Sequence, residues 1–269
     1  MQEAYLLGTA EEGEKCMAEK KKPAGGAMRL DRLLGEMGIG TRSQIRKMAG
    51  KGLIQVNGQT IKTADIKVDP RKDSILAEGR PVRYVPYEYY MLNKPQGVVS
   101  ATEDGRYPTV VELIDTAARK DLFPVGRLDV DTEGLLLLTN DGELINALMR
   151  ASNYHEKEYL VRVNRPVTDA FLKKMSEGVF LKELDVQTRP CRVEQEGKFT
   201  FRIVLTQGLN RQIRRMCRTL GMDVTGIKRV RVANITLGRL TPGNYRLVEK
   251  EELQELYRIA GAKGVPTWR

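Results

Sequence analysis

The chain has 269 residues, of which 41% are hydrophobic, and it carries a formal net charge of +10. This length predicts two domains, and the charge predicts a polyanionic partner, either nucleic acid or an anionic membrane surface. No apolar run is long enough to span a bilayer, and no secretory signal begins the chain. The cysteines, Cys16, Cys191 and Cys217, are too dispersed for a disulfide framework or a Cys-x-x-Cys zinc site, so we predict a cytoplasmic protein.

Residues 1–27 mix Glu, Lys, Gly and Ala with little periodicity, which predicts a flexible leader. A compact unit begins near residue 28. Its first helix is predicted by apolar residues at helical spacing, namely Leu30, Leu33, Leu34 and Met37. Thr41 and Gln44 have the spacing of a capping box, which predicts a second helix. The alternation over 54–59 then predicts short strands joined by a turn.

The outward face of the second predicted helix is basic. Residues 28–85 contain twelve basic and six acidic side chains, and this surplus indicates a phosphate-binding face. The alternative is an ordinary solvated helix surface. The candidate nucleic-acid contacts of this unit are Arg29, Arg32, Arg42, Arg46, Lys47 and Lys51.

A larger domain, predicted to span 88–260, follows a linker at 84–88 and leaves a C-terminal tail at 261–269. It begins with a strand at Tyr89 that Pro95 ends. Further strands are predicted over 159–163, 192–194, 200–205 and 229–237, and helices over 110–118, 143–150 and 168–177. Strands interspersed with single helices, without strict βαβ alternation, predict an α+β domain around a largely antiparallel sheet.

The segment from Gly126 to Gly142 is the most informative part of the chain. The sequence Gly126-Arg127-Leu128-Asp129 leads through an acidic turn into four consecutive leucines, which an Asn-Asp-Gly turn ends. Such an apolar run predicts a short strand buried on both faces. Asp129 is therefore expected at the mouth of a rigid core element. The alternative is that Asp129 and Asp131 only solvate a turn.

A helix is predicted over 211–220, with one basic face and one apolar face. Its arginines are at positions i, i+3, i+4 and i+7, namely Arg211, Arg214, Arg215 and Arg218. Its apolar residues, Ile213, Met216, Cys217 and Leu220, are displaced by two positions, which is about 200° around a helix. Guanidinium groups bind phosphate or carboxylate with paired donors that lysine lacks. The basic face is therefore a candidate binding surface, with an ordinary solvated face as the alternative.

Sites for cofactors and metals are not visible in the sequence. His155 is the single histidine, so a histidine-based metal centre and a Ser-His-Asp triad are both poorly supported. Neither a Gly-x-x-x-x-Gly-Lys-Ser/Thr loop nor a Gly-x-Gly-x-x-Gly turn after a strand is present. We therefore expect a reaction carried by side chains, without a cofactor and without a metal.

Three segments, at 126–134, 155–161 and 206–217, resemble in order the motifs of the RsuA/RluB/RluE/RluF family of RNA pseudouridine synthases. The resemblance covers residues from about 28 to 258. Residues 28–85 resemble an S4 RNA-binding domain, including its Arg-Leu-Asp opening and its Val-Asn-Gly turn. The third motif and the residues around His155 are most similar to the RluF branch, which acts on 23S rRNA, whereas the first motif is similar to the wider RsuA-like group.

This resemblance implies an S4 domain followed by a synthase domain with a mixed, largely antiparallel sheet and flanking helices. It implies isomerisation of uridine to pseudouridine by base flipping, with no cofactor. The catalytic residues would be Asp129, Tyr159, which stacks on the target uracil, and Arg214, which pairs with the carboxylate of Asp129. The RNA contacts of the synthase domain would be Arg127, Leu128, Val130, Leu209, Asn210, Arg211, Gln212 and Arg215.

The expected substrate is ribosomal RNA, with 23S rRNA ahead of 16S rRNA or tRNA because the third motif and the residues around His155 resemble the RluF branch. The first motif resembles the wider group, so the exact target uridine stays open. We expect a monomer with no membrane partner. The alternative from another class is a non-catalytic S4-type RNA-binding or ribosome-assembly factor. The presence of Asp129, Tyr159 and Arg214 argues against it, since a degenerate relative is expected to lose at least one of them.

Overall fold

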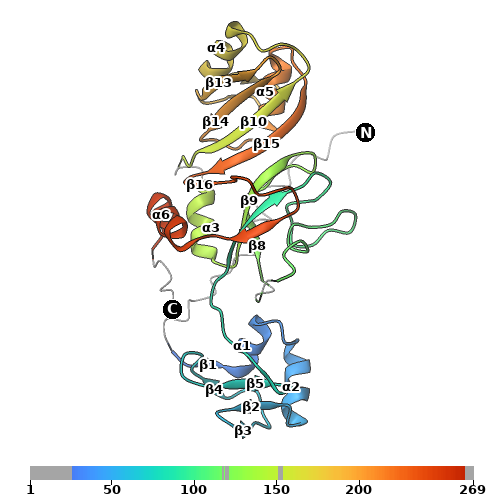
Figure 1. Ribbon diagram of the computed structural model, residues 1–269, viewed down its shortest axis with the longest axis vertical. Coiled ribbons are helices and arrows are strands. Elements are labelled where there is room, and N and C mark those ends of the chain that lie inside the picture. Colours follow the sequence, from blue (N-terminus) through green and yellow to red (C-terminus); the bar gives the residue numbers. More distant parts are fainter. Residues whose placement is uncertain (1–25, 117, 119–120, 151–153, 264–269) are drawn as a thin grey trace, which may run out of the picture. The chain divides into compact units, whose positions relative to one another are not determined.

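The computed structural model describes residues 26–116, 118, 121–150 and 154–263 (Figure 1). Residues 1–25 of the predicted leader, which include Cys16, and residues 264–269 of the predicted tail lie outside the described residues. The chain divides between Pro86 and Tyr87 into two compact units, which are described one at a time. No helix within the described residues is long and apolar enough to cross a membrane.

The first unit packs two helices against short strands. Its elements are β1 (Met28–Arg29), α1 (Leu30–Glu36), α2 (Arg42–Gly50), β2 (Ile54–Val56), β3 (Gln59–Thr60), β4 (Lys67–Val68), β5 (Ile75–Ala77) and β6 (Arg80–Pro81). β1 pairs with β4, and the other strands form a sheet in the order β3-β2-β5-β6. The predicted capping box is confirmed, because the Thr41 hydroxyl accepts from the Gln44 amide at 3.3 Å and the Gln44 side chain accepts from the Thr41 amide at 2.8 Å.

The second unit is built on one nine-stranded sheet. Its elements are β7 (Tyr89–Lys94), β8 (Phe123–Val125), β9 (Glu133–Thr139), α3 (Gly142–Met149), β10 (Lys157–Val163), α4 (Asp169–Glu177), β11 (Phe180–Leu181), β12 (Val186–Gln187), β13 (Arg192–Gly197), β14 (Thr200–Leu205), α5 (Gln212–Thr219), β15 (Val224–Val232), β16 (Ile235–Thr236), β17 (Tyr245–Leu247) and α6 (Lys250–Ala260). The main path of the sheet is β13-β14-β10-β15-β9-β7-β17. Among the strand pairings of this sheet in the described residues, β9–β15 is parallel and the others are antiparallel, so the predicted α+β fold with a mixed, largely antiparallel sheet is confirmed.

Two helix pairs cover the two halves of this sheet. α4 and α5 pack on the half formed by β13, β14, β10 and β15, whereas α3 and α6 pack on the half that contains β7 and β9 (Figure 1). The leucines of β9 alternate between two cores: Leu135 and Leu137 face α3 and α6, and Leu136 and Leu138 face the opposite side. The prediction of a strand buried on both faces is therefore confirmed.

Two predicted elements differ from the structure. The helix predicted over 110–118 is a series of turns, although residue 117 lies outside the described part. The Thr116 amide donates to the Tyr245 hydroxyl at 3.2 Å, and a side-chain partner replaces the carbonyl that a helix would supply. The strand predicted over 229–237 is broken into β15 and β16, because Ala233 adopts a left-handed conformation at φ 50°. The helix α6 was not predicted.

Gly134 allows β9 and β15 to approach each other. It pairs with Arg229 in the parallel register and has a φ of 111°, which side-chain-bearing residues rarely adopt. A Cβ at this position would lie 2.3 Å from the carbonyl oxygen of Arg229. Because this contact is with backbone, it cannot be relieved by a rotamer change, and the glycine is required where the two halves of the sheet meet.

We expect Gly134→Ala to lower the free energy of unfolding by about 2–4 kcal/mol, because the two backbones must separate and the residue must hold a positive φ. Urea unfolding monitored by circular dichroism measures the change. Gly142→Ala is the matched control, since a Cβ there meets nothing within 4 Å. Equal midpoints for the two variants would show that the β9–β15 junction tolerates a side chain.

Candidate active site

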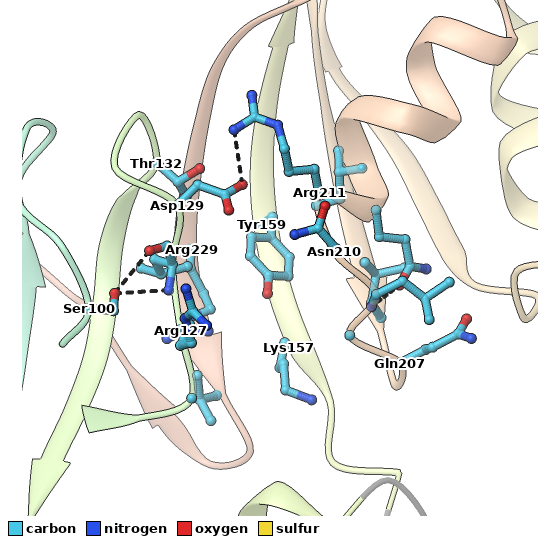
Figure 2. A pocket seen from close by; sticks show the side chains of 18 of the residues that line it. Ser100, Arg127, Asp129, Thr132, Lys157, Tyr159, Gln207, Asn210, Arg211 and Arg229 are labelled. Atoms are coloured by element: carbon cyan, nitrogen blue, oxygen red, sulfur yellow. Dashed lines mark hydrogen bonds and ion pairs between the residues drawn. The ribbon is translucent and has the colours of Figure 1, made fainter. Parts of the chain in front are cut away.

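An open cleft of about 1240 Å³ lies over the second unit (Figure 2). Its walls come from the turn before β9, from β10, from the loop before α5 and from the segment after α3. Seven basic and three acidic side chains line the cleft, which gives it a surplus of positive charge. The basic ones are Arg127, Arg150, Lys157, Arg189, Arg211, Arg214 and Arg229, and the acidic ones are Asp104, Asp129 and Asp131.

The turn that carries Asp129 is fixed through its backbone. The Thr132 amide donates to the Asp129 carbonyl at 3.0 Å. The Ser100 hydroxyl donates to the Leu128 carbonyl at 2.9 Å, and the same oxygen accepts from the Leu128 amide at 3.0 Å. The Leu128 side chain, predicted as an RNA contact, is instead buried in the core. The Asp129 carboxylate remains 35% exposed and faces the cleft (Figure 2).

A buried lysine donates a hydrogen bond to the backbone of this turn. Lys94 is fully buried at the end of β7, and its ammonium donates to the carbonyls of Pro95 and Thr132, each at 2.9 Å. Burial lowers the pKa of Lys94 to about 8, and the nearby carboxylates of Asp131 and Asp129 oppose that shift. Sequence reasoning noticed only the proline that ends this strand, although a lysine that closes an apolar run was a visible signal.

The arginines before and within α5 bind the acidic turn, but not in the predicted pairs. Arg214, which is 13% exposed, contacts the Asp131 carboxylate at 3.1 Å and also donates to the Asp131 carbonyl at 3.1 Å. Asp129 instead has Arg211 as its partner, at 3.7 Å. Arg211 also contacts Asp131 at 3.1 Å. The predicted Arg214–Asp129 pair is therefore wrong. Arg211 precedes the helix with a φ of 49°, and its guanidinium reaches across to both carboxylates.

The rest of α5 agrees in part with the predicted two faces. The apolar stripe is confirmed, since Ile213, Met216 and Cys217 are buried. The basic face is less open than predicted. Arg215 donates to the Asn210 carbonyl at 3.1 Å and pairs with Glu183, while Arg218 stays exposed. Gln212, predicted as an RNA contact, is also buried, and its side-chain oxygen accepts from the Leu209 amide at 3.0 Å.

Tyr159 lies in the cleft between the turn of Asp129 and the loop that carries Asn210 (Figure 2). It follows Lys157 on β10, and a bulge between Glu158 and Tyr159 shifts the register against β15. Bulges of this kind re-aim side chains next to binding sites. Burial, and to a smaller extent the charge of Arg229, lower the pKa of Lys157. The predicted catalytic residues Asp129, Tyr159 and Arg214 thus line one cleft.

Arg229 is a second buried cation of this site that sequence reasoning missed. Its Nε donates to the Leu135 carbonyl at 2.7 Å, and one of its terminal nitrogens is buried without a partner among the described residues. A buried charge is tolerated when hydrogen bonds replace its lost hydration, and the Leu135 carbonyl supplies one such bond to Arg229. In the described part of the chain, no group of three or more His, Cys, Asp or Glu side chains is arranged to hold a metal ion.

The basic residues predicted in the first unit fall into two groups. Arg29 pairs with Asp31 at 2.8 Å, and Arg32 pairs with Glu36 at 2.8 Å, so both guanidiniums have partners within the fold. The remaining predicted contacts are exposed and have no carboxylate partner among the described residues, namely Arg42, Arg46, Lys47 and Lys51.

Known proteins and family models match both units of this chain. A family model described as RNA pseudouridylate synthase matches residues 88–219, and a model of the S4 domain matches residues 28–74. The protein named dual-specificity RNA pseudouridine synthase RluF from Salmonella typhi is 40% identical over 236 residues, which cover 86% of this chain and 79% of that protein. The chain belongs to the RsuA/RluB/RluE/RluF family of RNA pseudouridine synthases.

Other family members agree. The ribosomal small subunit pseudouridine synthase A of Haemophilus influenzae is 32% identical, over 86% of this chain and 100% of that protein. A crystal structure described as a pseudouridylate synthase has a TM-score of 0.61 and 31% identity, over 85% of this chain and 99% of that one. The chain is therefore an RNA pseudouridine synthase with an N-terminal S4 domain, as the resemblance implied.

Lys94 gives a pH dependence that can be measured. Its pKa in the folded protein, about 8, lies below the ordinary 10.5, so between these values the unfolded chain holds a proton that the folded chain has released. Stability therefore rises with pH across this window. Between pH 7.5 and 10.5, we expect Lys94→Met to remove about 2–3 kcal/mol of the rise in the free energy of unfolding. Urea unfolding at a series of pH values measures this change. The exposed Lys250→Met should keep the wild-type profile; a Lys94→Met profile that also matches wild type would contradict this assignment.

Double-mutant cycles on stability test the corrected pairing. Arg214→Ala combined with Asp131→Ala should show a coupling of about 1 kcal/mol, because the pair is only half shielded from water. Arg214→Ala combined with Asp129→Ala should be additive within about 0.5 kcal/mol. Stronger coupling of Arg214 to Asp129 than to Asp131 would restore the pairing predicted from the sequence.

Proposed function

We propose that this enzyme isomerises a uridine of 23S rRNA to pseudouridine and that Asp129 is the carboxylate that drives the reaction. The observation that carries the proposal is the placement of Asp129. It lies on a backbone-fixed turn in a basic cleft, with its carboxylate exposed and Tyr159 beside it (Figure 2). A half-exposed carboxylate in a cleft that attracts phosphate is suited to react with an RNA nucleotide that has left its stack.

The reaction needs no oxidant and no second substrate. The bond between N1 of uracil and C1′ of ribose breaks, the base turns, and C5 bonds to C1′. C5 then loses its proton and N1 gains one, so atoms and charges balance. Asp129 can attack as a nucleophile or remove a proton from the sugar, and both roles use the ionised carboxylate. The Tyr159 ring offers a stacking surface, and its hydroxyl offers a group for the proton transfer at C5.

The remaining cleft residues are proposed to hold the RNA. Arg127 and Arg211 are exposed at the cleft and can meet phosphate groups, while Val130, Leu209 and Asn210 line the wall. Extrusion of a base from an RNA helix costs a few kcal/mol, and contacts to phosphate and to an aromatic ring offset that cost. In this account Arg214 supports the Asp129 turn through Asp131 rather than touching the RNA, and Arg215 is occupied within the fold.

We propose that the first unit increases the affinity of the enzyme for RNA and takes no direct part in the reaction. The exposed, unpaired basic residues of α2 and its C-terminus form a phosphate-binding face, which suits the S4 domain. We propose that this RNA-binding domain spans 28–85, that the synthase domain spans 88–260, and that the enzyme acts as a monomer in the cytoplasm. The relative from Salmonella typhi is named dual-specificity RNA pseudouridine synthase RluF, and the resemblance of this chain to the RluF branch supports 23S rRNA as the substrate.

The same chemistry on 16S rRNA is the second candidate. The Haemophilus influenzae relative is named for the ribosomal small subunit and is matched over its whole length. tRNA is a third substrate with the same requirements. A non-catalytic binding role is disfavoured, because Asp129 and Tyr159 line one cleft with the supporting Arg214.

We expect Asp129→Asn to abolish pseudouridine formation while RNA binding is largely kept, because the substitution preserves shape and removes the negative charge. Tyr159→Phe should keep stacking and bind RNA normally, yet lower turnover strongly. Unmodified 23S rRNA, 16S rRNA and tRNA transcripts are treated with each protein, and pseudouridine is mapped by chemical labelling. Asp169→Asn, an exposed carboxylate on α4 outside the cleft, is the control. Turnover by Asp129→Asn at the wild-type rate would refute the mechanism. If the wild-type enzyme modified 16S rRNA or tRNA but not 23S rRNA, the proposed substrate would be wrong and the modified RNA would take its place.

A further inference from the structure

A tyrosine and an arginine stack on each other at the cleft, apart from the residues used above. The Arg189 guanidinium lies 4.3 Å from the centre of the Tyr154 ring. Both residues line the cleft, and they come from distant parts of the chain, since Tyr154 precedes β10 and Arg189 lies between β12 and β13. Tyr154 is nevertheless 53% exposed, so the guanidinium covers only part of it.

The fold holds this pair in place at a cost. Tyr154 has a φ of 51°, a left-handed conformation that bulky residues rarely adopt and that is enriched at binding sites. The Arg189 amide donates to the Gln207 side chain at 3.1 Å, and Gln207 belongs to the loop before α5, which also lines the cleft. The pair is thereby tied to the same loop that carries Asn210 and Arg211.

The Arg189 guanidinium has no carboxylate partner among the described residues. A guanidinium stacked on an aromatic ring keeps its edge donors free for phosphate, and it makes the ring a rigid platform. The cleft volume of about 1240 Å³ also exceeds the roughly 300–1000 Å³ of pockets for single small molecules. There is room for more than the one uridine that reacts at Asp129.

We propose that Tyr154 and Arg189 form a subsite for an unpaired nucleotide beside the target uridine. The base stacks on the open side of the Tyr154 ring, and Arg189 binds a phosphate of that nucleotide. This inference rests on the proposed function, because it names a second contact to the same RNA. Stacking tolerates any base, so the subsite selects single-stranded conformation rather than sequence. A base held here keeps the strand open next to the target.

Binding is measured separately from activity, so that the two proposals can fail independently. The probe is a single-stranded nonauridine with one 2-aminopurine moved through its positions, whose fluorescence is quenched by stacking. Wild-type protein should quench it at one preferred position. Tyr154→Ala should remove that quenching and weaken binding about fivefold or more, whereas Tyr154→Phe should retain both. Arg189→Ala should weaken binding and reduce its salt dependence by about one phosphate contact, which Arg189→Lys should partly restore.

The matched control is Phe199→Ala. Phe199 is 38% exposed and has the ammonium of Lys198 5.5 Å from its ring centre, but it does not line the cleft. It should behave as wild type. Quenching at no position, or Tyr154→Ala binding that equals Phe199→Ala binding, would overturn the subsite even if the enzyme forms pseudouridine. Loss of quenching in Tyr154→Ala would support the subsite even if 23S rRNA is not modified, and only the proposed substrate would then fail.

Discussion

The candidate active site depends on one short parallel pairing in an otherwise antiparallel sheet. β9 follows the turn of Asp129, and β15 follows α5, so their junction brings this turn opposite the loop before the helix. Gly134 permits the close approach, and the buried Arg229 donates from β15 to the Leu135 carbonyl of β9 at 2.7 Å. The cleft is therefore a consequence of how the two halves of the sheet join, rather than of a loop laid over a finished domain.

Buried basic side chains hold the backbone of the turn, while the carboxylate of Asp129 remains accessible from the cleft. Burial lowers the pKa of Lys94, so this lysine loses its proton more readily than a surface lysine. Its side-chain nitrogen donates to the Thr132 carbonyl of the turn. Arg214 is directed to Asp131. Asp129 is left with Arg211 as its partner at 3.7 Å, and Arg211 also contacts Asp131 at 3.1 Å. The Arg211 side chain is 43% exposed, and a solvent-exposed pair contributes about 1 kcal/mol or less. Arriving phosphate can therefore compete for Arg211 without a large penalty.

Patterns along the sequence predicted the helices and strands well, whereas they did not predict which residues distant in sequence contact each other. The capping box at Thr41 and the apolar stripe of α5 depend on spacing along one helix, and both were confirmed. The run of four leucines between two turns likewise predicted β9. The pairing of Arg214 with Asp129, which the family resemblance implied, differs from the structure. Asp129 and Asp131 are two residues apart, and only the tertiary position of α5 decides which of them Arg214 contacts. The false helix over 110–118 failed for a similar reason, since Tyr245, distant in sequence, takes the Thr116 amide.

A crystal structure of the Asp129→Asn protein bound to an RNA fragment that contains the target uridine tests the role of Asp129 most directly. We expect this uridine to be flipped into the cleft and stacked on the Tyr159 ring, with its C1′ about 3.5 Å from the side chain at position 129. The Asp131–Arg214 pair should be unchanged. A uridine that remains stacked in the RNA, or that binds in the cleft without approaching position 129, would contradict the central role of Asp129.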